Sequence, residues 1–198
     1  MSHFLGLVVG SLGSLDRYDE NLEVEPYIYY NAAEAYEVAS TTALNILDNI
    51  ESFSELVNKD ELTNLLVSKN QLGLIEWYTK WGGYHHCDEE GNIYSIYNPE
   101  SKWDWYQVGG RWDGHIPTKS GERVNQCTIQ EVDWKKIEVP FCFIDIDGEW
   151  REKGEMGWWC MVNNEKEDLE WDKDFKAFSG YMRAHYPDEL ITVIDFHI

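Results

Sequence analysis

An apolar run of strand length stands near each end of this chain, and the two runs limit the folds that it can adopt. Phe4–Val9 ends at Gly10, and the only titratable residues in Leu190–Ile198 are Asp195 and His197. Short runs that are almost continuously apolar are typical of strands buried on both faces of a sheet. We therefore predict that the two runs lie side by side at the centre of one sheet.

Three segments have the three- and four-residue apolar spacing of amphipathic helices. The first begins with Asn31–Glu34, a capping-box sequence, and reaches Phe53, with a break allowed near Asp48. The second covers Asp60–Trp81 and the third covers Asp168–His185. In the second, Gly73 allows a break, and the inward residues are predicted to be Leu62, Leu65, Leu66, Leu72, Ile75 and Trp77. In the third they are predicted to be Trp171, Phe175, Phe178 and Met182.

Short strands dominate the second half of the chain. A turn at Asp88–Asn92 is predicted between strands Tyr84–Cys87 and Ile93–Tyr97, and a turn at Asp147-Gly148 between Phe141–Ile146 and Met156–Val162. Because helices and strands segregate more than they alternate, we predict an α+β fold, an antiparallel-rich sheet with helices packed on one face and an acidic helical N-terminal part.

Length and composition favour a single α+β domain over residues 1–198. Residues 1–81 would form a strand plus the acidic helical part, and residues 82–198 the Trp-rich sheet part with the C-terminal helix and strand. No apolar run approaches bilayer length, and no basic segment typical of a secretory signal opens the chain, so we expect a cytoplasmic protein. We expect free thiols at the four dispersed cysteines, Cys87, Cys127, Cys142 and Cys160.

The formal net charge of −21 is the strongest global property of the sequence. It opposes direct nucleic-acid binding, because phosphate attracts Lys and Arg. It suits a basic partner, such as a protein groove that normally holds DNA or RNA, although acidity can also serve solubility alone. The predicted partner-binding residues lie on the polar face of the first helix: Glu34, Glu37, Asp48, Glu51 and Glu55.

The segment Asn98–Trp112, NPESKWDWYQVGGRW, is called the Trp-rich motif below. It places charged residues between large aromatics, which suits a cleft with flat apolar walls and a few polar groups. In an extended segment Lys102, Asp104 and Tyr106 would share one face, and Trp103 and Trp105 the other. The predicted ligand-binding residues are Lys102, Trp103, Asp104, Trp105, Tyr106, Arg111 and Trp112. The alternative is architectural: Lys102 and Arg111 pair with Asp104, Asp113 or Glu100, and the tryptophans pack as core.

Candidate catalytic residues are fewer. Asp195 and His197 share one side of a strand and could join His85 or His86 in a metal site, but no His-x-x-x-His or Cys-x-x-Cys spacing supports this, and a structural hydrogen-bonded pair is preferred. Asp145 and Asp147 could be paired carboxylates, or turn residues, the commoner role. The cysteines occupy apolar or acidic settings that raise the thiol pKa. We predict no metal and no cofactor, and assign no catalytic residue.

The Trp-rich motif resembles a family of uncharacterised phage and bacterial proteins with an NPxSKWDWYxxGGRW segment. Later segments are similar to that family as well: Asp147–Trp150, Gly154–Trp159 and Val193–His197. The resemblance covers the C-terminal sixty per cent or so of the chain, implies no catalytic residues, and makes a host-takeover or anti-defence role worth testing.

Two functional hypotheses follow. The first, and the one we favour, is a non-enzymatic phage-type binding protein that inhibits a host nucleic-acid-binding defence complex, as anti-CRISPR proteins and DNA mimics do. Its partner would be a basic host protein or nucleoprotein complex in the host cytoplasm, with no direct nucleic-acid or membrane binding. The alternative is a small enzyme or ligand-binding protein that holds an anionic, nucleotide-like ligand in the Trp-rich motif.

Overall fold

The computed structural model describes residues 2–53, 55–156 and 161–198, which form two compact units. The first, here called the sheet unit, comprises Met1–Leu22 and Asn98–Ile198, and the second, the helical unit, comprises Glu23–Tyr97. The helical unit is thus an insertion between two parts of the sheet unit. We predicted one domain, with a division after residue 81. The sequence has no glycine- or proline-rich linker near Leu22 or Asn98 that would mark the ends of the inserted unit.

The sheet unit is built on the two terminal runs. Strand β1 (His3–Val9) pairs antiparallel with β13 (Leu190–His197) along its whole length, as predicted. The strand order is β10-β9-β1-β13-β5, and β8 (Gln126–Thr128) also pairs with β13. The remaining strands are β9 (Cys142–Ile144), β10 (Trp150–Glu152) and β5 (Trp105–Val108). Only β9 runs parallel to its neighbour β1, so the predicted antiparallel-rich α+β class is confirmed.

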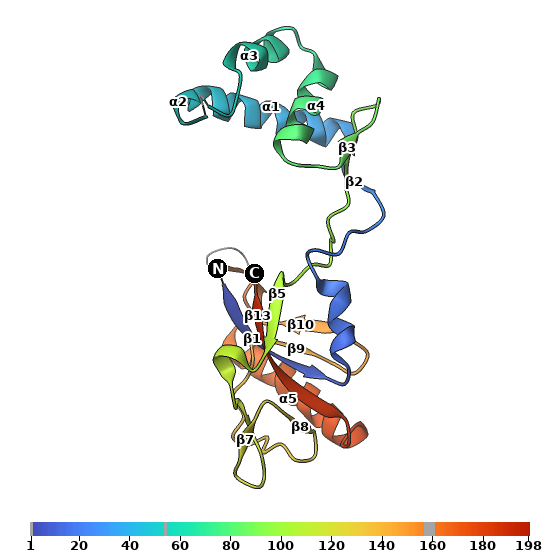
Figure 1. Cartoon of the computed structure of the whole chain (residues 1–198), viewed down its shortest axis with the longest axis vertical. Helices are drawn as coiled ribbons and strands as arrows, with labels where there is room; N and C mark the ends of the chain where they lie inside the picture. The colour runs from blue at the N-terminus through green and yellow to red at the C-terminus, as the bar shows by residue number, and fades with distance from the viewer. Residues whose placement is uncertain (1, 54, 157–160) are drawn as a thin grey trace. The chain divides into compact units, whose positions relative to one another are not determined.

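The two faces of this sheet have different covers. Helix α5 (Asp168–His185) packs on the face that carries Leu7 and Val193, and its buried residues are those predicted: Trp171, Phe175, Phe178 and Met182 (Figure 1). The 3₁₀ helix η1 (Leu12–Tyr18) supplies residues to the cluster on the opposite face, with Phe4 and Val8. We call these the α5 face and the η1 face.

The turn at Asp147-Gly148 is observed, with Gly148 at a φ of 81°, but its second strand is β10 rather than the predicted Met156–Val162. Residues 157–160 lie outside the described chain, and β11 (Glu155–Met156) pairs with β12 (Val162–Asn163). The sheet unit also contains η2 (Gly110–Trp112), β6 (Ile116–Pro117) and β7 (Arg123–Val124).

The helical unit contains four helices and a small antiparallel sheet within its described residues. Its helices are α1 (Ala32–Asp48), α2 (Ile50–Phe53), α3 (Lys59–Val67) and α4 (Gln71–Trp81). Its sheet has the order β2-β4-β3, formed by Tyr27–Tyr30, Ile93–Ser95 and His86–Cys87, so the predicted hairpin across Asp88–Asn92 is present. The capping box at Asn31 and the break after Asp48 are present as well.

The predicted second helix is in fact two helices, and the break is not at Gly73. Lys69 has a φ of 54° between α3 and α4, and Asn70 then caps the new helix by accepting from the Gly73 backbone N–H at 3.1 Å. Restarting the helix changes which side faces inward. Leu72, predicted to be inward, is therefore exposed, whereas Leu74 is buried. Within the described residues, no helix combines the length and apolar character that a bilayer crossing requires.

Candidate functional site

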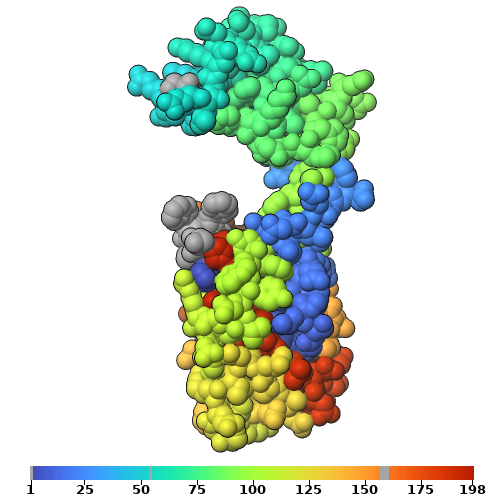
Figure 2. Space-filling view, in the orientation of Figure 1, coloured from blue at the N-terminus to red at the C-terminus, as the bar shows by residue number. Residues whose placement is uncertain are grey.

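The first part of the Trp-rich motif anchors the chain where it re-enters the sheet unit. The buried Asn98 side chain donates to the carbonyl oxygens of Arg17 at 2.8 Å and Asp19 at 2.9 Å. The Arg17 guanidinium binds both carboxylate oxygens of Glu100, at 3.0 and 3.2 Å. In Figure 2 the yellow-green motif lies on the surface of the sheet unit beside the blue N-terminal segment. These contacts have an architectural role.

Lys102 and Trp103 also have architectural roles. The Lys102 Nζ lies 2.6 Å from Oε1 of Glu152, whose other oxygen accepts from the Trp150 indole at 2.8 Å. Trp103 is buried, and its ring meets that of Tyr106 edge-on, with centroids 5.0 Å apart. The architectural alternative, in which Lys102 forms an ion pair and Trp103 packs in the core, therefore describes this part of the motif. The partner of Lys102 is Glu152, however, and not Asp104, Asp113 or Glu100.

The predicted alternation of the motif is wrong at its start. Trp103 and Tyr106 both pack on the η1 face, while Asp104 contacts His197 on β13. Trp105 is half exposed, and its ring centroid is 6.3 Å from that of His197. Strand β5 begins only at Trp105, so strand alternation does not apply to the residues before it.

Asp104 belongs to a cluster of two aspartates and two histidines that lies beside Trp105. The register of β1 on β13 places His3 opposite His197. His3 Nδ1 is 2.9 Å from Asp195 Oδ1, and His197 Nδ1 is 2.5 Å from Asp104 Oδ1. The imidazole rings are in edge contact, with centroids 4.9 Å apart and planes at 77°. We call these four residues the paired Asp–His cluster.

Burial and hydrogen bonding leave one nitrogen of the His197 imidazole without a partner among the described residues. A carboxylate at Nδ1 favours the tautomer with the proton on Nδ1, so Nε2 carries the lone pair. The Nε2 atom of His197 is buried and has no hydrogen-bond partner among the described residues. The side chains of Asp195 and Asp104 are 3% and 31% exposed, so the cluster reaches the surface on the Asp104 side.

Gly109-Gly110 brings the motif backbone against this cluster. Gly110 has a φ of 54°, and a Cβ there would lie 2.4 Å from Asp195 Oδ2. The Arg111 backbone N–H donates to the same oxygen at 3.0 Å, so Asp195 bridges His3 and the motif. The Arg111 side chain is exposed and has no ion-pair partner in the described parts of the chain, contrary to the expected pairing with Asp104, Asp113 or Glu100.

The structure therefore brings together only part of the predicted ligand set. Asp104, Trp105 and the Arg111 backbone meet at the cluster, while Lys102, Trp103 and Tyr106 lie elsewhere, and Trp112 packs against the α5-face core. His85 and His86 belong to the helical unit, where the His86 ring stacks on Tyr94. Among the residues described, no His, Cys, Asp and Glu group is arranged to hold a metal ion.

Sequence reasoning missed His3. The predicted pairing of the two terminal runs could have indicated this residue. If the runs are antiparallel with His3 opposite His197, both histidines lie on the side of the sheet that carries Asp195.

The other candidate residues have structural roles. Asp145 Oδ1 accepts the backbone N–H groups of Asp147 at 3.1 Å and Glu149 at 3.0 Å, which is turn chemistry. Burial raises the pKa of the Cys127 thiol to about 11 and that of Cys142 well above its ordinary value, so neither is a nucleophile at neutral pH. Cys87, Cys127 and Cys142 are free thiols, and Cys160 lies outside the described residues.

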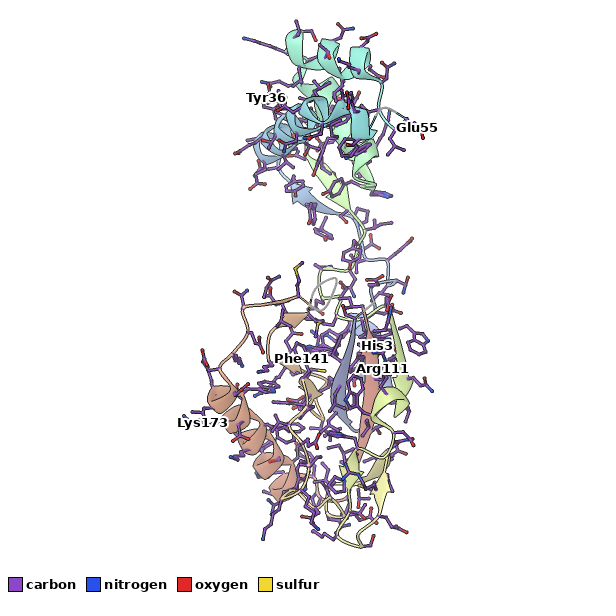
Figure 3. All side chains as sticks on the ribbon, turned by 90° about the vertical axis from the view of Figure 1, so that its left-hand side faces the viewer. His3, Tyr36, Glu55, Arg111, Phe141 and Lys173 are labelled. Atoms are coloured by element: carbon purple, nitrogen blue, oxygen red, sulfur yellow. The ribbon has the colours of Figure 1, made fainter. Side chains whose placement is uncertain are left out.

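The predicted acidic surface lies in the helical unit, which contains thirteen acidic and three basic residues. Glu34, Glu37, Asp48, Glu51 and Glu55 are all exposed. Glu34 accepts the Asn31 backbone N–H at 3.0 Å in the capping box. Within the described ranges Glu37, Asp48 and Glu55 have no ion-pair partner, and Figure 3 places Glu55 at the edge of this unit.

Comparisons of the chain with protein-family models, curated proteins and solved structures gave no match. The resemblance carried by the Trp-rich motif therefore stays a prediction, and the functional argument depends on geometry and charge.

Proposed function

We propose that this chain is an acidic phage- or mobile-element-type protein that binds a basic, nucleic-acid-binding surface of a host defence complex and inhibits it. The observation that carries this proposal is a group of exposed carboxylates that have no ion-pair partner among the described residues: Glu37 and Asp48 on α1, and Glu55 after the end of α2. Carboxylates with no internal cation keep their full charge for a partner.

The physical basis is electrostatic competition with nucleic acid. A basic groove attracts polyanions over distances of about one Debye length, roughly 8 Å at physiological ionic strength. An acidic surface that reaches the groove first gains association rate and excludes the natural ligand. The helical unit combines high acidity with only three basic residues, Lys59, Lys69 and Lys80.

The test compares charge reversal in the two units. The triple variant Glu37→Lys, Asp48→Lys and Glu55→Lys, made in the full chain, should lose capture of a basic nucleic-acid-binding host complex at low ionic strength. The triple variant Glu138→Lys, Glu170→Lys and Glu189→Lys, at exposed positions of the sheet unit, changes the net charge by the same amount; it is the matched control and should retain capture. Binding by wild type that is unchanged by salt, or retained by the triple variant, would contradict the proposal.

A second function is favoured by the paired Asp–His cluster. We infer that an anionic, nucleotide-like ligand binds beside Trp105, where a half-exposed indole adjoins the ring of His197. Arg111 supplies a guanidinium without an ion-pair partner among the described residues.

Tryptophan fluorescence titrated with nucleoside monophosphates measures this binding. Arg111→Ala should weaken it about tenfold or more without lowering Tm, because an exposed arginine holds little of the fold. A drop in Tm with unchanged binding would assign Arg111 a purely structural role.

A further inference from the structure

We propose that His3 and His197 form an acid–base pair that hydrolyses a small phosphodiester. This inference deepens the second proposed function, since it assigns a reaction to the ligand that would bind beside Trp105. It starts from an arrangement that core packing does not require: two imidazoles in edge contact, each with Nδ1 on a separate aspartate.

The tethering of Nδ1 prepares each ring for proton transfer. An aspartate at Nδ1 orients the imidazole and stabilises the charge that forms when Nε2 takes a proton. His3 has Asp195 for this purpose and His197 has Asp104. With ring centroids 4.9 Å apart, oxygens of a single phosphoryl group can contact both rings.

The unpartnered nitrogen gives an independent reason to expect a ligand. His197 is 8% exposed, and its Nε2 has no partner among the described residues. A buried polar atom without a hydrogen bond costs roughly 1–3 kcal/mol of stability. A water molecule or ligand hydroxyl that donates to this atom would recover that cost, so the site favours a bound O–H group where folding alone leaves the nitrogen unsatisfied.

The local charge suits a monoanion. The backbone of Arg111 lies at the cluster, and in this proposal its exposed guanidinium supplies the positive charge that holds the ligand. A phosphodiester carries a single negative charge and needs a proton on its leaving oxygen, which the protonated imidazole provides. A long polynucleotide is excluded by the net charge of −21, so the substrate class is a small diester with a base or ring that stacks on Trp105.

The reaction balances without any further reagent. The neutral imidazole takes a proton from water as the water oxygen forms a bond to phosphorus. The bond from phosphorus to the leaving oxygen breaks, and the protonated imidazole gives its proton to that oxygen. The products are a phosphomonoester and an alcohol, and a proton exchange with solvent restores the two rings.

Turnover of bis(p-nitrophenyl) phosphate by the full chain tests this reaction, with p-nitrophenyl acetate as the acyl-ester comparison. Wild type should release nitrophenolate from the diester. His3→Gln and His197→Gln should each lower kcat: the variant that lacks the base by about 100-fold or more, and the variant that lacks the acid by less, because nitrophenolate leaves readily without a proton. His115→Gln is the matched control, because His115 is a buried histidine of the same unit outside the cluster.

The outcomes separate this inference from the function that it depends on. Nucleotide quenching of tryptophan fluorescence without diester turnover would overturn the acid–base role and leave ligand binding in place. Absence of both would overturn the two together. Turnover that survives in the His3→Gln, His197→Gln double variant would overturn the assignment of the residues, and melting curves show that each variant is folded.

Asp104 is a positioning residue in this scheme. Asp104→Asn should lower kcat with little change in KM, because the amide no longer stabilises the imidazolium, and Asp104→Glu should restore part of the rate. An equal loss of kcat in Asp104→Asn and Asp104→Glu, with a fall in Tm in both variants, would indicate a structural role.

Discussion

The sheet unit and the helical unit use charge in opposite ways. In the sheet unit, Lys153 lies 2.7 Å from both Glu165 and Asp168, and Lys166 lies 2.7 Å from Asp174. In the helical unit the three lysines have no ion-pair partner among the described residues. Acidic side chains of the sheet unit thus form ion pairs with lysines, whereas those of the helical unit form no ion pair with its three lysines among the described residues. Net charge alone does not show in which unit the acidic side chains are paired with lysines.

The units also differ in how they hold their helices. Helix α5 has no side-chain N-cap, and it is stabilised by an aromatic core in which the Phe143 ring lies 4.3 Å from that of Phe178. Helices α1, α3 and α4 each begin at a capping asparagine: Asn31, Asn58 and Asn70. Helices α3 and α4, with 9 and 11 residues, gain less from burial than the 18-residue α5, so satisfied end groups matter more to them.

The largest expected effect tests the close approach of the motif to the cluster. Gly110→Ala should lower the free energy of unfolding by about 2–4 kcal/mol, because the new methyl group meets Asp195 and the positive φ is strained. Gly83→Ala in the helical unit has a similar φ of 69° and open space around it, so it should cost only about 1 kcal/mol. Denaturant titration of both variants measures the difference, and equal losses would refute the packing argument.

Removing a helix cap should affect the helical unit selectively. Asn31→Ala removes the acceptor for two backbone N–H groups of α1 and should cost about 1 kcal/mol. Glu167→Ala at the start of α5 removes no capping bond and should stay within about 0.5 kcal/mol of wild type. Urea titration followed by circular dichroism is the measurement, and a reversed order would contradict the comparison.

A smaller effect concerns acid stability. Burial lowers the pKa of His115 below its ordinary 6.5, with a weaker opposing influence from its contact with the Glu138 carbonyl. His115 therefore binds a proton more tightly in the unfolded chain than in the folded one. Its contribution to the free energy of unfolding is present above about pH 6.5 and is lost as the pH falls through the lowered pKa of the folded state. His115→Asn should flatten the stability profile in this window. His85→Asn, at an exposed site in the helical unit, should leave it unchanged.

The smallest effects differ in direction. Lys176→Ala breaks an i,i+4 pair with Asp172 on α5 and should cost roughly 0.3–0.5 kcal/mol. Glu37→Gln removes the i,i+3 repulsion with Glu34 on α1 and should be neutral or slightly stabilising. Thermal melts at low salt can resolve the two, and a clear loss of stability in Glu37→Gln would mean that its charge supports the fold.

Helices and strands with a clear apolar pattern were predictable from the sequence. Sites that are formed by residues distant in the chain were less predictable. Helix α5 matches its predicted bounds, and β1 and β13 differ from theirs by a residue, because an aromatic stripe and long apolar runs leave one way to bury each segment. The break at Lys69 was missed, since a lysine at positive φ carries no turn signature.

The candidate site was only partly predictable, because segments that are distant in the chain form it together. Asp104 and Arg111 were singled out from the motif, but their environment is made by β1 and β13, distant in the chain. The Glu152 partner of Lys102 and the His3 partner of Asp195 depend on strand order, which one sequence does not specify.

One consequence follows from the route of the chain. Val24 donates to the Ile96 carbonyl at 3.0 Å, so the segment that leaves the sheet unit is paired with the one that returns to it. A deletion that joins Leu22 to Asn98 would remove the acidic helices and keep every strand of the central sheet. A gene for this protein could gain or exchange its acidic helical unit as a cassette, in a single recombination event, while the remainder of the reading frame stays intact.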